Sequence, residues 1–255
     1  MTTPARPLVL SDLDETLFMN SMKVPEAERQ SCTEVVRDTG YRLCVMTPRQ
    51  ANFFRWIAAT CDIIPVTARS LAAFQKIDLP FGNGWKIAGN GAVVINPDGE
   101  VDEEWAGIMC GELISYAGIL DEMHEAAAWR IRNSGLEATV KRYAEYGHEH
   151  CVLFSCVGPD HAYGSLATIA SRLRFGLRDN IHIHHNGGTL ALTAGPVSKK
   201  RAVEYVLTKI DNLAERPILA FGDSLSDLPF MSLGDFICAP SASQISTKTL
   251  HGINQ

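Results

Sequence analysis

Both ends of the chain alternate short, continuously apolar segments with segments in which apolar residues recur at helical spacing. Strands that are apolar on both faces are buried between layers of helices, so this alternation predicts an α/β fold with a parallel sheet. The predicted strands are residues 7–11, 62–66, 85–89, 217–221 and 236–239. The predicted helices are residues 48–60, 69–77 and 198–210, with a further helix beginning near Ser226. Hairpins are predicted at 33–46, turning at Asp38-Thr39-Gly40, and at 92–101, turning at Pro97-Asp98-Gly99.

The middle of the chain has a different pattern. A long helical segment is followed by two strands, a helix and a hairpin, at residues 103–133, 136–143, 150–157, 160–174, and 181–185 with 189–193. Asn186-Gly187-Gly188 is a typical hairpin turn. This α-β-β-α-β-β order predicts a smaller α+β domain of residues 103–194, inserted into a domain formed by residues 1–102 and 195–255.

Polar side chains follow three strands of the predicted parallel sheet. Asp12 and Asp14 follow the first strand, Thr67 follows the second, and Asp223 and Asp227 follow the strand at 217–221. Ligands of parallel sheets bind at the carboxyl ends of the strands, so we expect these side chains to converge. Two carboxylates ~4 Å apart repel by about 4 kcal/mol at an effective dielectric near 20, so a cation or protons must offset their charge. An all-oxygen site of this kind suits Mg²⁺.

Lys199 adds an ammonium group at the start of the helix predicted at 198–210. With the carboxylates and the Thr67 hydroxyl, it completes the groups that phosphoryl transfer requires: a nucleophile, an acid/base, a metal site and donors to phosphate oxygens. Each group alone has a simpler explanation. Asp12 and Asp14 could form a solvated turn, Lys200 could take the place of Lys199, and Asp227 could cap a helix.

Four motifs in this order resemble the haloacid dehalogenase (HAD) superfamily of phosphatases. They are DLDET at 12–16, IPVT at 64–67, VSK at 197–199 and GDSLSD at 222–227. The inserted segment resembles the C2B-type caps of sucrose-phosphate phosphatase, mannosyl-phosphoglycerate phosphatase and Cof-like hydrolases, and IAGNGAVV at 87–94 resembles the segment that precedes those caps. The resemblance implies a Rossmann-like HAD core with a cap that governs substrate specificity.

The resemblance also implies a role for each motif residue. Asp12 would form an aspartyl-phosphate, and Asp14 would protonate the leaving group and later activate water. Thr67 would bind a phosphoryl oxygen, and Lys199 would hold Asp12 and the phosphate. The implied Mg²⁺ ligands are Asp12, Asp14 through its carbonyl, Asp223 and Asp227.

Candidate substrate contacts lie outside these motifs. His182 and His184 alternate with apolar residues in a predicted strand, so both point to one face, either towards substrate or simply towards solvent. Asn90 is a third candidate, and Lys141, Arg142, Arg172 and Arg174 are weaker ones. Glu15 stands where the family usually has a small residue, and residues 18–47 predict an extra hairpin near the entrance.

The charge and cysteine content of the chain predict its type of partner and its cellular location. The net charge is -6, and the densest basic run, SKKR at 198–201, stands alone, so we expect no nucleic-acid or membrane partner. Seven cysteines without CxxC spacing and the lack of a long apolar run predict a cytoplasmic protein.

We expect a Mg²⁺-dependent phosphohydrolase acting on a small phosphorylated metabolite, with a sugar phosphate as the first candidate. A phosphomutase is the alternative enzyme, and a phosphate-sensing module, which would be shorter and uncapped, is the alternative outside enzymes.

Overall fold

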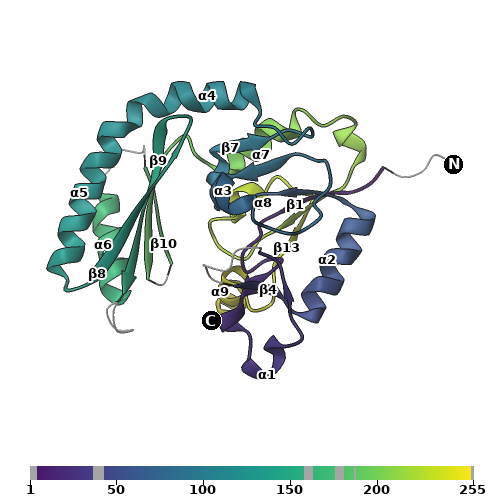
Figure 1. Ribbon diagram of the computed structural model, residues 1–255, viewed down its shortest axis with the longest axis horizontal. Helices are drawn as coiled ribbons and strands as arrows, with labels where there is room; N and C mark the ends of the chain where they lie inside the picture. The colour runs from purple at the N-terminus through teal and green to yellow at the C-terminus, as the bar shows by residue number, and fades with distance from the viewer. Residues whose placement is uncertain (1–4, 37–42, 158–162, 176–180, 187, 254–255) are drawn as a thin grey trace. The chain divides into compact units, whose positions relative to one another are not determined.

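The computed structural model describes residues 5–36, 43–157, 163–175, 181–186 and 188–253 of the 255-residue chain (Figure 1). The chain divides into two compact units, a core unit of Met1–Asp102 with Lys199–Gln255 and an inserted unit of Glu103–Ser198. Residues 195–198, which the sequence assigned to the first domain, fall with the inserted unit in this division. No helix among the described residues is long and apolar enough to cross a membrane.

The core unit is built on a four-stranded parallel sheet with the order β13-β12-β1-β5. The strands are β1 (Leu8–Ser11), β5 (Asp62–Pro65), β12 (Ile218–Phe221) and β13 (Phe236–Cys238). Ser11 lies level with Pro65 on one side and with Phe221 on the other, so these three strands end at the same edge. The predicted parallel sheet is therefore confirmed, and its shared edge can bring the motif residues together.

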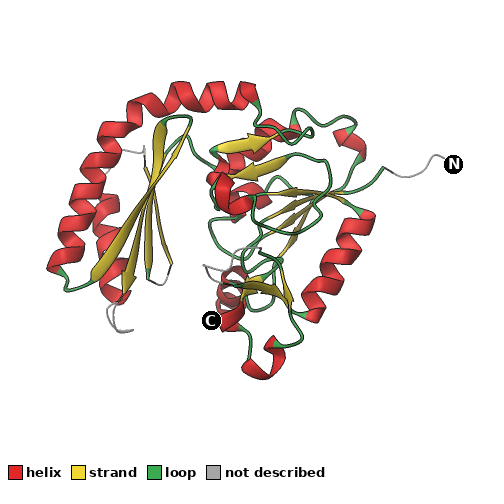
Figure 2. Cartoon of the chain, viewed as in Figure 1, coloured by secondary structure: helices red, strands yellow, loops and turns green. Residues whose placement is uncertain are grey.

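Helices and short 3-10 turns connect the strands of the core unit (Figure 2). They are η1 (Ser21–Lys23), α1 (Glu26–Arg29), α2 (Pro48–Thr60), α3 (Leu71–Phe74), η2 (Gly89–Gly91), α7 (Lys199–Leu207), η5 (Leu213–Glu215), α8 (Leu228–Met231) and α9 (Gln244–Ile253). Local sequence fixes the start of α2, because the Thr47 hydroxyl accepts the Gln50 N–H while the Gln50 side chain accepts the Thr47 N–H, and Pro48 occupies the first turn. This helix buries Phe54 and Ile57.

Two small antiparallel sheets complete the core unit. The strands β2 (Met19–Asn20), β4 (Cys44–Met46) and β3 (Thr33–Glu34) form one, in that order. The predicted hairpin at 33–46 is thus present as β3 and β4, while its turn lies outside the described residues. The other sheet pairs β6 (Lys86–Ala88) with β7 (Val93–Ile95). The strand predicted at 85–89 is therefore β6, which pairs antiparallel with β7 and is joined to the residue after β5 by a single Val66–Ile87 bridge. Of the hairpin predicted at 92–101, the structure contains β7 and a single Ile95–Val101 bridge.

The inserted unit is a four-stranded antiparallel sheet with helices on one face. Its elements are α4 (Glu103–Leu113), η3 (Ile114–Tyr116), α5 (Ala117–Asn133), β8 (Glu137–Glu145), β9 (His148–Val157), α6 (Tyr163–Phe175), β10 (Ile181–Asn186) and β11 (Thr189–Ala194). The predicted α-β-β-α-β-β order is confirmed, except that η3 interrupts the long first helix. Alternate residues of β9, among them Val152 and Phe154, are buried beneath α5, which leaves the opposite sheet face open.

Candidate active site

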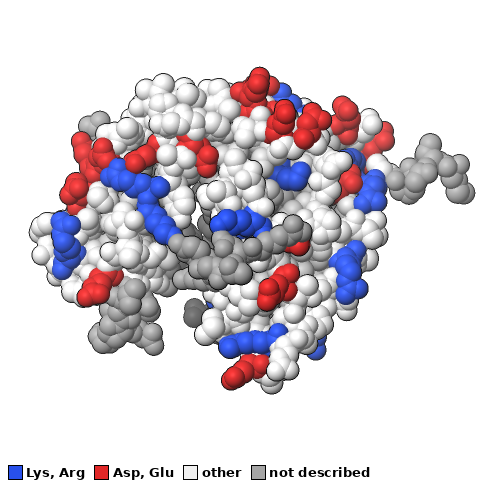
Figure 3. Space-filling model, in the orientation of Figure 1, with Lys and Arg blue, Asp and Glu red and all other residues white. Residues whose placement is uncertain are grey.

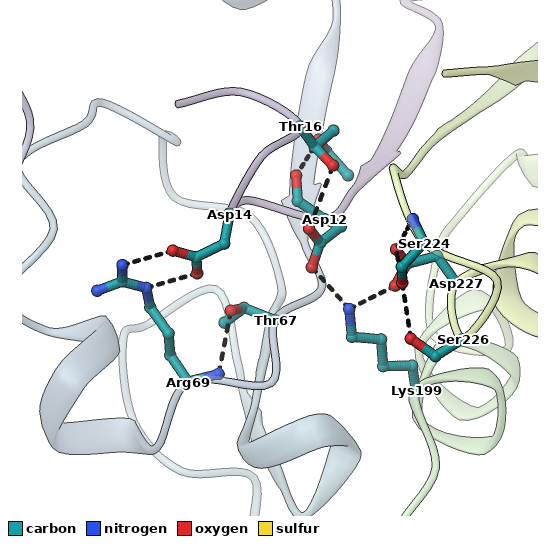
Figure 4. Close-up of polar contacts among 10 residues, drawn as sticks. Asp12, Asp14, Thr16, Thr67, Arg69, Lys199, Ser224, Ser226 and Asp227 are labelled. Atoms are coloured by element: carbon teal, nitrogen blue, oxygen red, sulfur yellow. Dashed lines mark hydrogen bonds and ion pairs between the residues drawn. The ribbon is translucent and has the colours of Figure 1, made fainter. Parts of the chain in front are cut away.

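Asp12 lies directly beyond the end of β1. Its backbone N–H donates to the Phe221 carbonyl at 2.9 Å, which extends the β1–β12 ladder by one residue. Its carboxylate is buried and is held at both oxygens: Lys199 Nζ donates to Oδ1 at 2.6 Å, and Thr16 Oγ1 donates to Oδ2 at 3.2 Å (Figure 4). Strand, ammonium and hydroxyl together fix the orientation of this carboxylate.

Lys199, the first residue of α7, lies between two buried carboxylates. Its Nζ is 2.6 Å from Asp12 Oδ1 and 2.7 Å from Asp227 Oδ1 (Figure 4). Burial alone would lower the pKa of Lys199, but the two carboxylates raise that pKa above its ordinary value, so the group stays an ammonium. Lys200 instead pairs with Glu204 at 3.6 Å, so Lys199 is the lysine that reaches the site.

The turn after β12 supplies the remaining acids. Asp227 is 1% exposed, and its Oδ2 accepts hydrogen bonds from the Ser224 N–H at 3.0 Å and the Ser224 hydroxyl at 2.8 Å. Although Asp227 precedes α8, its side chain makes no capping hydrogen bond to that helix. Burial would raise the pKa of Asp227, but Lys199 and the Ser224 donors outweigh burial and hold it below its ordinary value. Its carboxylate is therefore bound by Lys199 and Ser224 and does not cap the helix.

Asp12, Asp223 and Asp227 form a group that could hold a cation, since one carboxylate oxygen from each lies within 4.8 Å of the others. Burial, assisted by Asp227, raises the pKa of Asp12 to about 7 against the opposing effect of Lys199. Burial and Asp227 raise the pKa of Asp223 to about 6. Three acids around one ammonium leave an excess of negative charge, and an all-oxygen donor set fits Mg²⁺.

Asp14 lies apart from this group and is bound by an arginine that the motifs did not identify. Arg69 Nε and an Arg69 terminal nitrogen donate to the two Asp14 oxygens at 2.7 and 2.6 Å (Figure 4). Burial would lower the pKa of Arg69, but the hydrogen bonds to Asp14 raise it. The available signal was the position of this arginine, two residues beyond the strand-ending Thr67.

Thr67 and Asn90 lie beside each other. Thr67 is buried, and its hydroxyl oxygen accepts the Arg69 N–H at 3.1 Å, which leaves the hydroxyl proton available for another acceptor. The Thr67 carbonyl accepts the Asn90 N–H at 2.9 Å. Asn90 has a φ of 59°, in the left-handed region that asparagine tolerates better than most residues. The structure thus places Asp12, Thr67, Lys199, Asp223 and Asp227 at one edge of the sheet.

Comparison with solved structures identifies the architecture, whereas no protein-family model and no curated protein matches the sequence. The C-terminal domain of Candida albicans trehalose-6-phosphate phosphatase is 14% identical with a TM-score of 0.60, over 90% of this chain and 73% of that one. A haloacid dehalogenase-like hydrolase from Bacillus subtilis is 14% identical with a TM-score of 0.54, over 95% and 92%. The sucrose-phosphatase of Synechocystis is 14% identical with a TM-score of 0.52, over 98% and 88%.

The chain has the haloacid dehalogenase-like fold. This fold accounts for the parallel sheet of the core unit and for the α+β unit inserted between the second and third motifs. Since identities near 14% establish a fold and not an activity, the roles of the site residues rest on their geometry.

In the inserted unit of this fold, His182 and His184 lie on the open face of the sheet. They are paired with Thr193 and Ala191, whereas the alternating Ile181 and Ile183 are buried. His182 Nε2 is also 3.1 Å from the Gly195 carbonyl oxygen. Of the weaker candidates, Arg142 is bound by Asp121 and Glu149, and the side chain of Arg174 lies outside the described residues.

Proposed function

We propose that the protein is a Mg²⁺-dependent phosphohydrolase that cleaves a phosphate monoester of a small metabolite through an aspartyl-phosphate. The observation that carries this proposal is the buried Asp12–Lys199–Asp227 arrangement, in which one carboxylate is oriented at both oxygens at the end of β1. A structural ion pair would not need the adjacent Asp223, the Thr67 hydroxyl or the half-exposed Asp14. These groups match the parts of phosphoryl transfer.

The reaction has two steps. An Asp12 oxygen attacks phosphorus, the bond from phosphorus to the ester oxygen breaks, and that oxygen takes a proton from Asp14 and leaves as the alcohol. Water then attacks the aspartyl-phosphate and gives a proton to Asp14, and the bond from phosphorus to Asp12 breaks to release phosphate. Lys199 and the Thr67 hydroxyl donate to the phosphoryl oxygens, which carry the developing charge.

Asp12, Asp223 and Asp227 would hold the Mg²⁺ ion, and the resemblance of the motifs adds the Asp14 backbone carbonyl as a fourth ligand. When bound, the ion offsets negative charge on the carboxylates and the phosphate, which otherwise repel each other. This chain contributes the ligands, and Lys199 supplies a second, permanent positive charge beside them.

The substrate we propose is a sugar phosphate. Two structural neighbours are named as phosphatases of trehalose 6-phosphate and of sucrose phosphate. The open face of the inserted sheet carries a cross-strand row of hydroxyls, Thr139, Ser155 and Thr189, next to the row that contains the His184–Ala191 pair. Hydroxyls and imidazoles suit a neutral polyol, so we assign substrate selection to this unit, with His182 and His184 as proposed contacts. Asn90, in the core unit, is a further proposed contact.

We also propose a cytoplasmic location and a small-molecule partner. The seven cysteines, all of which lie among the described residues, form no disulfides with one another, as expected of a reducing compartment. On the face drawn in Figure 3, the basic side chains of the described residues lie in small groups interspersed with acidic ones. Such a surface is not the continuous basic band that binds nucleic acid.

The test is phosphate release from a panel of sugar phosphates with Mg²⁺. We expect hydrolysis of at least one ester, its loss on chelation, and its loss in Asp12→Asn. Asp98→Asn, at an exposed turn of the same unit, is the matched control and should retain activity. Full activity of Asp12→Asn would refute the mechanism. Conversion of one sugar phosphate into another without phosphate release would assign a phosphomutase instead.

A further inference from the structure

Arg69 is fixed at its backbone by the two segments that flank it. Its N–H donates to the Thr67 hydroxyl at 3.1 Å, and its carbonyl accepts the Gly89 N–H at 2.6 Å. The segment after β5 and the turn η2 therefore hold this residue on both sides. Its Cα position is set by the same hydrogen bonds that place Thr67 at the site.

The Arg69 side chain is also constrained along its length. The guanidinium lies over the Phe18 ring, 5.3 Å from the ring centroid, and Phe18 is fully buried. One terminal nitrogen contacts Cys44 Sγ at 3.1 Å, and Cys44 is buried in β4. These two contacts fix the orientation of the guanidinium plane. The two parallel N–H donors of that plane, called the fork below, can bind a carboxylate in only one orientation.

Asp14 depends on this fork for its orientation. Its side chain is 46% exposed, whereas the preceding Leu13 is fully buried, so the core fixes the backbone but not the carboxylate. Among the described residues, Arg69 is the cation paired with Asp14, through two hydrogen bonds of 2.7 and 2.6 Å. Each carboxylate oxygen has two lone-pair positions, so the fork leaves one on each oxygen for another partner.

We propose that Arg69 is a positioning residue that holds the Asp14 carboxylate in the orientation required for proton transfer to the leaving group. This inference rests on the proposed function, in which Asp14 exchanges a proton first with the ester oxygen and then with water. The fork restricts Asp14 without occupying the positions through which the proton passes. A displacement of a catalytic group by about 1 Å can cost about 100-fold in rate, which sets the expected effect.

The test compares two esters that differ in their need for a proton. An alkyl phosphate, the best sugar phosphate of the panel, leaves as an alkoxide that requires protonation, whereas p-nitrophenyl phosphate releases a stable phenolate. The constant kcat/KM reports the first step, which forms the phosphoenzyme. Arg69→Met should lower kcat/KM for the sugar phosphate about 100-fold and for the aryl ester far less. Arg69→Lys, which keeps the charge but not the fork, should fall between Arg69→Met and the wild type.

A double variant and a control separate positioning from general destabilisation. Adding Arg69→Met to Asp14→Asn should lower kcat/KM no further than Asp14→Asn alone, because the two residues act as one unit. Arg216→Met is the control, since Arg216 also pairs with an aspartate, Asp62, but before β12, at the amino end of the sheet. It should change both esters by the same small factor.

Three outcomes decide the matter. An equal loss on both esters in Arg69→Met, matching the loss in Arg216→Met, would overturn the positioning role while leaving the phosphohydrolase intact. Additive losses in the double variant would overturn it as well. Release of phosphate from neither ester by the wild-type protein would refute the proposed function itself. Thermal unfolding shows whether Arg69→Met is folded, and Arg69→Lys provides the comparison if it is not.

Discussion

Glu15 has an unfavourable backbone conformation beside the candidate site. Its φ is 61°, in the left-handed region where a side chain with a Cβ is strained. Its carboxylate is 3.0 Å from Lys23 Nζ and accepts the Asn20 N–H at 3.5 Å, which ties the loop after β1 to η1. This conformation gives a physical reason for the small residue that the family resemblance implies at this position.

Replacing Glu15 with glycine should therefore give a more stable protein than replacing it with alanine. Both variants lose the Lys23 pair, but only alanine keeps the strain, so Glu15→Gly should be more stable than Glu15→Ala by about 1 kcal/mol. Chemical denaturation measures the free energy of unfolding. At Glu204, in the interior of α7, alanine should be the more stable replacement. The same order at both positions would contradict the left-handed conformation of Glu15.

His150 should make the inserted unit sensitive to acid. It is 3% exposed, and neither ring nitrogen has a hydrogen-bond partner among the described residues. Burial lowers the pKa of His150 to about 4. The unfolded chain, with a pKa of 6.5, then binds the proton first, so stability is lost as the pH falls from 6.5 towards 4, by up to about 3 kcal/mol.

His150→Leu should consequently gain stability over the wild type at pH 5, with a smaller difference at pH 8. Denaturant unfolding followed at both pH values measures this. His182→Leu is the control, because this histidine is exposed on the opposite, open face of the same sheet. If His150→Leu shifted stability equally at the two pH values, His150 would not be the titrating group.

The sequence predicted which residues would meet at the edge of the sheet but not the contacts that orient them. Asp12, Thr67 and Lys199 were assigned because each follows a strand end or starts a helix in a recognised motif. Arg69 and Ser224 were missed because each acts through a neighbouring carboxylate, and such hydrogen bonds depend on loop conformation, which local spacing does not encode. The positions of the acids follow from the strands, whereas their orientations follow from tertiary contacts.

At the scale of elements, the apolar strands were predictable and the short connecting elements were not. The strands at 7–11, 62–66 and 217–221 form the parallel sheet because an uninterrupted apolar run has few other places to be buried. The helix α9 was missed, since its sequence, QISTKTLHGI, is rich in threonine and serine and carries little helical propensity. The extra hairpin expected at 18–47 is a three-stranded sheet with η1 and α1.

The turn between β12 and α8 depends on the glycine at its start. A Cβ at Gly222 would lie 2.6 Å from Met231 Sδ and 2.7 Å from Asp227 Cβ, closer than such atoms approach. Gly222→Ala should therefore push Asp227 away from Lys199 and lower both stability, by about 1–3 kcal/mol, and phosphatase activity. Gly84→Ala is the control, because its nearest atom is 3.6 Å away. Unchanged activity in Gly222→Ala would show that the turn adjusts without moving Asp227.

At the scale of the whole molecule, the carboxylate group is a net cost to folding unless protons or a cation balance it. Burial raises the pKa values of Asp12 and Asp223 to about 7 and about 6, above their ordinary 3.8. Between pH 3.8 and these raised pKa values, the folded protein thus binds more protons than the unfolded chain. The stability that this provides is complete below pH 3.8 and is lost as the pH rises through 6 and 7.

Mg²⁺ should replace those protons and restore the lost stability. The ion competes with protons for the same oxygens, so it should raise the melting temperature more at pH 8 than at pH 5. The measurement compares Mg²⁺ with a chelator at each pH, so that groups remote from the site, His150 among them, cancel. A Mg²⁺-induced shift of equal size at both pH values would contradict proton competition at Asp12 and Asp223.

Matched aspartate variants assign that shift to the site. Asp223→Asn removes one carboxylate of the proposed ligand group, and it should reduce the Mg²⁺-induced shift at pH 8 while raising stability in the chelator, because one repelling charge is gone. Asp98→Asn removes an equal charge from an exposed turn and should leave the shift intact. If the two variants responded alike, Mg²⁺ would be acting on the overall acidic charge of the protein and not on the edge of the parallel sheet.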